Sequence, residues 1–137
     1  MAENQVPEKI QREIFEKRGD KRYKLDAYLF IMNGLEFYCT LLGEKRHVTG
    51  QEFSKGLLFY AHKQFGALAR SVLRHWGINS TDDLGNIVYH LISIRVMSKQ
   101  PEDSIDDFSS VVDLDEFFNA QDDFEIDGNF IKSINGA

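Results

Sequence analysis

The side chains that most often carry catalysis or bind metals are spread along this chain instead of being gathered in one motif. The histidines and the single cysteine fall on separate predicted segments: His47, His62, His75, His90 and Cys39. Metal sites built from histidine usually contain close pairs, as in HExxH, and the sequence contains no such pair. The GxSxG, Walker, GxGxxG and CxxC patterns are also missing. The sequence therefore predicts no catalytic residue, no bound metal and no cofactor.

Cys39 lies within the most apolar run of the chain, residues 27–42. Buried thiols are usually unreactive, so we expect Cys39 to be a small core side chain. A single cysteine forms no internal disulfide, which fits a reducing cytoplasm. The first residues lack the pattern of a secretory signal, and the apolar run is too short to cross a bilayer and contains Asn33 and Glu36. We therefore expect a cytoplasmic protein without membrane contact.

A calcium site is the other candidate that the residue types suggest. Asp123, Glu125 and Asp127, followed by Gly128, match the start of a calcium-binding loop, in which oxygen ligands alternate along the chain. The match fails at its twelfth position, where Ile134 stands in place of a bidentate glutamate. A plain Asp-Gly turn between two short extended segments explains the same residues without a metal, and we favour the turn.

Charge is divided unequally along the chain of 137 residues, whose net charge is −6. Residues 101–137 carry eleven carboxylates and one lysine, a net charge of −10, whereas residues 1–100 have a net charge of +4. An acidic carboxyl-terminal tail should repel nucleic acid and attract the basic part of the same chain.

One basic cluster offers a route to nucleic acid. It consists of Lys17, Arg18, Lys21, Arg22 and Lys24. These cations can bind RNA phosphates and the acidic tail can mask them, although solvated charges at a helix end are the common explanation. Duplex DNA is an unlikely partner, because the helix that would enter the major groove starts with Asp82 and Asp83.

Helical periodicity dominates the elements that must position these side chains. Residues 7–17 favour a short amphipathic helix, which either docks or stays loose, and residues 24–42 favour a helix that is apolar on nearly all sides. Thr49 and Glu52 form a capping box that starts a further helix, and Gly66 interrupts it. The next helix ends at Gly77 in a Schellman-type turn.

One more helix and then two short strands are predicted after Gly77. Ser80 caps a helix over residues 81–94, and residues 96–98 and 108–112 then favour two short strands around a polar loop. A helix, a turn at residues 77–79, a second helix and a hairpin follow the order of a winged-helix domain. The predicted fold class is therefore mainly α (α+β), a helical single domain with a small β-hairpin and a winged-helix-like order. A helical bundle with an incidental hairpin is the alternative.

Two stretches carry distinctive motifs: RYKLDAYLFIMNGLEFY at residues 22–38, and residues 46–92 with HVTGQE, HWGI and STDDLG. Through these motifs, residues 22–118 resemble a conserved family of small bacterial proteins to which no function is assigned. The resemblance implies a bacterial, cytoplasmic protein. It implies no activity, because the family has no established functional residues to transfer.

These observations divide the chain into an amphipathic and basic segment (1–21), a single globular domain (22–118) and an acidic tail (119–137). We expect a protein–protein interaction or regulatory module that binds a protein partner or a second copy of itself. The candidate partner-binding residues surround a glycine on the helix over residues 81–94: Asp82, Gly85, Asn86, Tyr89 and His90. Nucleic-acid binding through the basic cluster is the alternative, and a metal-dependent or other enzyme is the third.

Overall fold

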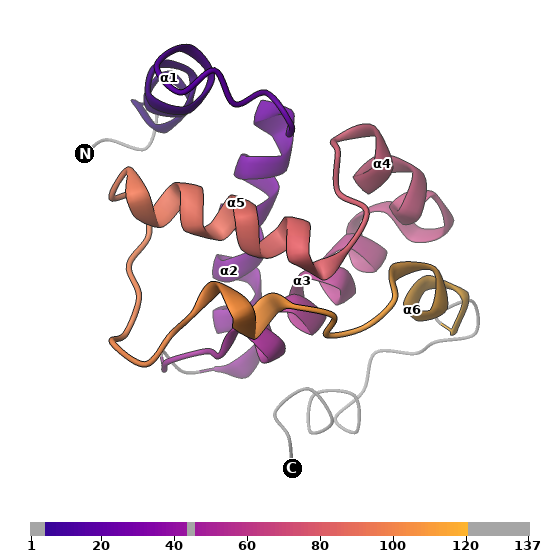
Figure 1. Ribbon diagram of the computed structural model, residues 1–137. Helices are drawn as coiled ribbons and strands as arrows, with labels where there is room; N and C mark the ends of the chain where they lie inside the picture. The colour runs from indigo at the N-terminus through magenta and orange to yellow at the C-terminus, as the bar shows by residue number, and fades with distance from the viewer. Residues whose placement is uncertain (1–4, 44–45, 121–137) are drawn as a thin grey trace.

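Helices account for the regular structure in the computed structural model, which describes residues 5–43 and 46–120 (Figure 1). In chain order they are α1 (Val6–Ile10), the π-helical turn η2 (Gln11–Glu16), α2 (Leu25–Leu42), α3 (Gly50–Phe65), the 3₁₀ turn η3 (Gly66–Leu68), α4 (Ala69–His75), α5 (Thr81–Ser93), the 3₁₀ turn η4 (Ile105–Phe108) and α6 (Leu114–Ala120). The prediction of a mainly α fold is confirmed. None of these helices has the length and apolar character of a membrane span.

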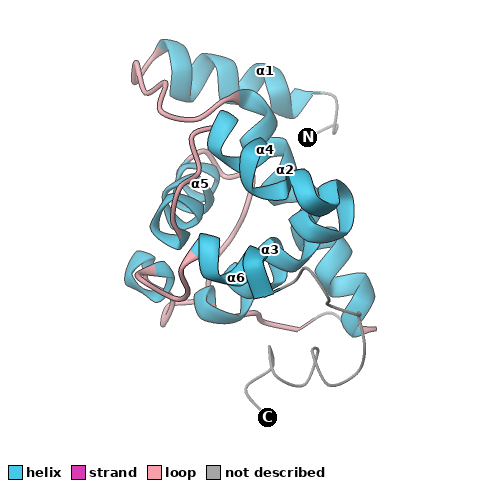
Figure 2. Cartoon of the chain, turned by 90° about the vertical axis from the view of Figure 1, so that its right-hand side faces the viewer, coloured by secondary structure: helices cyan, strands magenta, loops and turns pink. Residues whose placement is uncertain are grey.

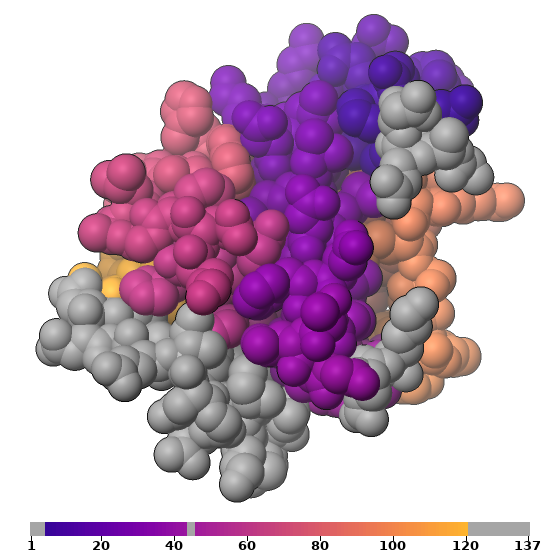
Figure 3. All heavy atoms as spheres, turned by 180° about the vertical axis from the view of Figure 1, so that it is seen from behind, coloured from indigo at the N-terminus to yellow at the C-terminus, as the bar shows by residue number. Residues whose placement is uncertain are grey.

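The apolar helix α2 lies at the centre of the fold, as its sequence predicts. It packs against α1, α3 and α5, and Tyr28, Ile31 and Tyr38 are fully buried. Seen from behind, α2 runs down the middle of the molecule, between the α4 side and the segment that follows α5 (Figure 3). On the other side of the core, α6 packs against α3 and α4 (Figure 2) and buries Leu114 and Phe117.

The amphipathic segment at the start of the chain is docked. Residues of α1 and η2 place Val6, Ile10 and Ile14 in the same buried cluster as the side chains of α2 and α5. Gly19 then takes a left-handed backbone conformation, with φ of 64°, and turns the chain toward α2. This segment is therefore part of the core and not a loose arm.

The predicted cap residues stand at both helix starts, and one of the two starts has a complete capping box. The Thr49 side chain accepts a hydrogen bond from the Glu52 amide (3.1 Å), and Ser80 and Asp83 form a complete capping box at the start of α5. In the first cap, the Glu52 carboxylate does not complete a box but binds Tyr38 and Arg46. That carboxylate is used for tertiary packing.

The turn between α4 and α5 is the predicted Schellman motif. The Ile78 amide donates to the Leu73 carbonyl (2.8 Å), and Gly77 has φ of 95°. A Cβ atom on Gly77 would also lie 2.3 Å from the Arg22 carbonyl oxygen. Glycine is required here both for its backbone conformation and for the close passage of the segment before α2.

The predicted β-hairpin, and the winged-helix-like arrangement that depends on it, are not found in residues 5–43 and 46–120, which contain no strand. The reason lies in hydrogen bonds that a sequence pattern does not reveal. The Ser110 amide donates to Asp82 Oδ1 (3.0 Å) and the Val111 amide to Thr81 Oγ1 (3.0 Å). Backbone groups that a second strand would pair are thus bound to the first turn of α5. Phe108, the first residue of that predicted strand, is instead the last residue of η4, which Ser104 caps.

Candidate binding site

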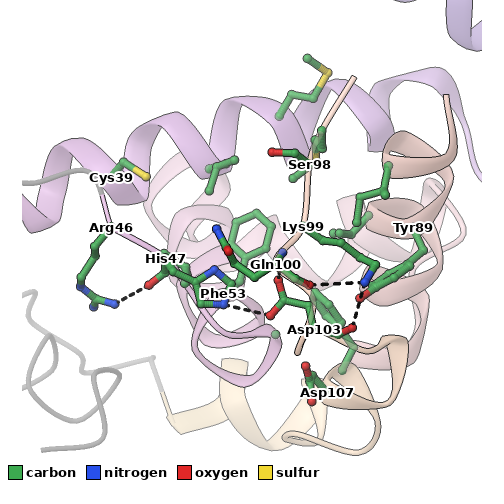
Figure 4. Close-up of a pocket in the computed structure, with 18 of the residues that line it drawn as sticks. Cys39, Arg46, His47, Phe53, Tyr89, Ser98, Lys99, Gln100, Asp103 and Asp107 are labelled. Atoms are coloured by element: carbon green, nitrogen blue, oxygen red, sulfur yellow. Dashed lines mark hydrogen bonds and ion pairs between the residues drawn. The ribbon is translucent and has the colours of Figure 1, made fainter. Parts of the chain in front are cut away.

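A cavity of about 1000 Å³ lies beside α2 (Figure 4). One stripe of α2, at helical spacing, forms one wall together with the glycine that follows the helix: Met32, Leu35, Glu36, Cys39, Thr40 and Gly43. Val88, Tyr89 and Ile92 of α5 and Phe53 of α3 form further walls. Two connecting segments, residues 46–48 and 97–108, border the rest. The volume is at the upper end of the range that is usual for ligand pockets.

The η4 turn can border the cavity because two glycines let it approach the helices. A Cβ atom on Gly85 of α5 would lie 2.6 Å from Phe108 Cβ, and one on Gly50 would lie 2.6 Å from Asp107 Cβ. Phe108 is therefore packed directly onto the backbones of α5 and α3. Its ring also meets the Tyr89 ring edge to face at 6.4 Å between centroids. These contacts fix one wall of the cavity.

Methionine is concentrated at this site. The chain has three methionines, and both of those that lie in the described residues, Met32 and Met97, line the cavity. Their unbranched, polarisable side chains adapt to apolar groups of different shapes. The cavity is therefore suited to apolar ligands that vary in shape.

Arg46 contributes a cation to the cavity, and a buried carboxylate neutralises it. Its guanidinium donates to both oxygens of Glu52, at 3.1 Å for Oε1 and in a shorter contact for Oε2. Glu52 is only 8% exposed and also accepts a hydrogen bond from the Tyr38 hydroxyl (2.6 Å). Burial, together with this bond to Glu52, raises the pKa of Tyr38, so its hydroxyl remains a donor. The three side chains tie the segment before α3 to α2.

His47 and Asp103 face each other across the two connecting segments. His47 Nε2 lies 2.9 Å from Asp103 Oδ1, and the other oxygen of Asp103 accepts from the Gln100 amide (2.8 Å). Burial raises the pKa of Tyr89, and the nearby charges of Asp103 and Asp107 raise it further. Tyr89 therefore presents a neutral hydroxyl to the cavity.

The position of Cys39 differs from the prediction. It is half-buried and lines the cavity instead of lying in the core. The helical stripe explains this, since Cys39 is one turn from Leu35 and two turns from Met32 on the same face of α2. A helix that is apolar all round does not show from its sequence which stripe faces a cavity.

The structure does not gather the predicted partner-binding residues on one surface. Tyr89 lines the cavity, whereas Gly85 is covered by Phe108. Asp82 accepts from the Ser110 amide, and Asn86 donates to the Tyr23 hydroxyl (2.9 Å). Their role in partner binding stays a prediction.

His90, the fifth of these residues, belongs to a polar cluster on the other side of α5. Its Nδ1 shares a hydrogen bond with the Tyr28 hydroxyl (2.8 Å), and its Nε2 lies 3.3 Å from Asp20 Oδ2. Burial lowers the pKa of His90, the Asp20 charge raises it, and the cations Arg22 and Arg18 lower it. His90 therefore links α5 to the linker before α2.

Other predicted candidates are separate from the cavity. The basic residues Lys17, Arg18, Lys21, Arg22 and Lys24 are all exposed. The calcium-loop candidates Asp123, Glu125 and Asp127 lie outside the described residues. Within the described ranges, no group of three or more histidine, cysteine, aspartate or glutamate side chains is arranged to hold a metal ion.

Comparisons with known proteins found no relative of this chain. No family model matches the chain, and no curated protein or solved structure matches it either.

Proposed function

We propose that the protein is a protein–protein interaction module without catalysis, and that its cavity beside α2 receives apolar side chains from a partner segment. The observation that carries this proposal is the cavity itself, with a volume of about 1000 Å³ and apolar walls from α2, α3 and α5. Met32 and Met97 support a partner segment with varied apolar side chains. The single cysteine and the bacterial resemblance of residues 22–118 support a cytoplasmic location.

Filling the cavity provides a direct test. A phage-displayed library of random peptides is panned against the immobilised full chain, and enriched peptides are resynthesised and measured by fluorescence anisotropy. Ile92→Trp and Met97→Trp place bulk in the cavity, so each should weaken peptide binding at least about tenfold. Leu68→Trp is the matched control, because Leu68 is 66% exposed and does not line the cavity.

Two results would overturn this proposal. One is a library that yields no peptide with preference for the wild-type chain. The other is a set of peptides that bind both cavity-filling variants as tightly as the wild type while circular dichroism shows that the variants are folded. A small molecule that co-purifies with the wild type and is lost from Ile92→Trp in native mass spectrometry would favour the enzyme alternative.

Nucleic-acid binding remains the second candidate because the side chains of the basic cluster are exposed. Arg22 is paired with Asp20 (2.9 Å) and Lys17 with Glu13 (3.4 Å), whereas Arg18, Lys21 and Lys24 form no ion pair within the described residues. Three unpaired cations on one short segment favour contact with a phosphate backbone.

A salt series tests this candidate with a single-stranded RNA oligonucleotide as the probe. If the cluster binds RNA and the tail masks it, the chain ending at Ala120 should bind more tightly than the full chain. The affinity should fall as salt rises, and neutralising Arg18, Lys21 and Lys24 should remove it. Weak curves that do not differ among the three proteins would exclude this candidate.

A further inference from the structure

The basic side chains around the cavity differ in the partners that they have. Arg46 is bound to the Glu52 carboxylate, and His47 Nε2 lies 2.9 Å from Asp103 Oδ1. Lys99 pairs with no carboxylate in the described part of the chain. It is the cavity cation whose charge is available to a ligand.

Lys99 is nevertheless held in place. Its ammonium donates to the main-chain carbonyls of Gln100 and Asp103, both at 3.4 Å, and Figure 4 shows it reaching back across the segment that carries them. These bonds are long and leave a third ammonium hydrogen for a ligand. Lys99 is therefore directed by its own loop without being neutralised by it.

The carboxylates at the cavity lie on the loop side and on α2. Asp103 lies against the His47 ring and accepts from the Gln100 amide, and Asp107 accepts from the Ser104 amide (3.1 Å), a bond that leaves its negative charge in place. Glu36, on the α2 wall, is exposed and forms no ion pair with a cation among the described residues. A negatively charged ligand group is thus attracted at the Lys99 ammonium itself, and repelled beside Asp107 and along α2 at Glu36.

We infer that the partner segment places a carboxylate beside its apolar anchor and that Lys99 binds this carboxylate at the loop side of the cavity. This inference rests on the proposed function, because it names the chemistry of the segment that the cavity receives. The apolar anchor fills the space between α2 and α5. The carboxylate then points away from Glu36, which sets the direction in which the segment lies.

The peptide library also tests this inference. Peptides selected by the wild-type chain should be enriched in aspartate or glutamate next to an apolar residue, and those selected by Lys99→Met should not. Lys99→Met keeps the apolar stem of the side chain and removes its charge. For one acidic peptide, Lys99→Met should weaken binding about threefold to fivefold at about 0.15 M salt, and less at about 0.5 M, because a partly exposed ion pair is screened.

Matched variants separate the local charge from general electrostatics. Lys21→Met removes a lysine away from the cavity and should leave the affinity unchanged. Glu36→Gln should increase the affinity for the acidic peptide, since a repulsive carboxylate is removed. Each acidic peptide is also made with an amidated and with a free carboxyl terminus, and with its acidic side chain replaced by the amide. These peptides show whether the carboxylate comes from a side chain or from a chain end.

The outcomes of the two proposals are distinguishable. If peptides are selected and Ile92→Trp abolishes their binding, but neither acidic residues nor Lys99 affects the affinity, the carboxylate inference is wrong and the proposed function stands. Enrichment of basic residues in place of acidic ones would also overturn it, and would point to Glu36 as the charged contact. A library without cavity-dependent binders contradicts the proposed function itself.

Discussion

The His90 side chain joins the linker before α2 to α5 through a small set of polar contacts. Tyr28 and Asp20 occupy its two ring nitrogens, and Arg22 Nη2 lies 3.4 Å from Nε2 while pairing with Asp20. Next to it, the Tyr23 hydroxyl donates to Asp83 (2.6 Å). Burial, and then this bond, raise the pKa of Tyr23 to about 12. The cluster therefore keeps neutral aromatic hydroxyls and a neutral imidazole between charged groups.

His90 should make the folded state less stable in mild acid. Because burial lowers its folded-state pKa below the ordinary value of 6.5, the unfolded chain binds a proton first as the pH falls. The contribution to stability is thus present above about pH 6.5 and is lost as the pH falls through the folded-state pKa. Thermal unfolding at about pH 7.5 and about pH 5.5 should show a larger decrease in Tm for the wild type than for His90→Gln. Equal decreases would show that His90 does not contribute.

The Tyr38 hydroxyl should stabilise the folded state, because it donates a hydrogen bond to the buried Glu52 carboxylate. Tyr38→Phe removes the donor at 2.6 Å and leaves a mostly buried charge with one fewer partner, so the free energy of unfolding should fall by about 1–3 kcal/mol. Urea denaturation followed by circular dichroism measures this change. Tyr60→Phe is the control, since Tyr60 is half-buried with its ring against Phe30 and Phe37, and the expected change is within about 0.5 kcal/mol. A similar loss in both variants would mean that the effect comes from packing.

At the scale of elements, the η4 turn determines the shape of the cavity. The turn packs closely on Gly50 of α3 and Gly85 of α5. The residues that follow it are fixed by hydrogen bonds from the amides of residues 110 and 111 to the first turn of α5. The turn closes one side of a cavity whose opposite wall is the stripe on α2.

Gly85→Ala should displace this turn. The new Cβ atom would lie 2.6 Å from Phe108 Cβ, an atom next to the backbone that cannot rotate away. The free energy of unfolding should decrease by about 1–3 kcal/mol in spite of the better helix propensity of alanine. Ser93→Ala, at the exposed end of the same helix, should have little effect. Peptides selected by the cavity should bind Gly85→Ala less tightly, which anisotropy can measure. A stable variant with normal binding would contradict this account of η4.

Local signals predicted the helices well, and tertiary contacts explain what they missed. Thr49, Ser80 and Gly77 act within one turn of chain, so their effect can be read from neighbouring residues, and all three occupy the predicted caps. The hairpin failed because Ser110 and Val111 bind Asp82 and Thr81, which lie far away in sequence. The cavity was missed because α2 is apolar on most sides. In hindsight, Glu36 and Thr40 within that apolar run mark the stripe that faces it.

At the scale of the whole molecule, the basic cluster and the acidic segment around η4 are each anchored to the same hydrophobic core by a different buried side chain. The basic cluster follows η2, whose Ile14 is fully buried, and the acidic segment that contains η4 is anchored by Phe108. The amino-terminal segment therefore presents its cations from a fixed position.

Ile14→Ala should consequently destabilise the entire fold and not only the first segment. Ile14 is completely buried in the cluster shared with α2 and α5, so truncation leaves a cavity there and should cost about 2–4 kcal/mol. Leu68→Ala, at a position that is 66% exposed, should change stability by less than about 0.5 kcal/mol. Urea unfolding should show one transition with a lower midpoint when followed both by far-ultraviolet circular dichroism and by the fluorescence of Trp76, which lies at the end of α4. If the Trp76 transition stayed at its wild-type midpoint while part of the helical signal was lost earlier, the amino-terminal segment would unfold independently. The fixed placement of the basic cluster would then be wrong.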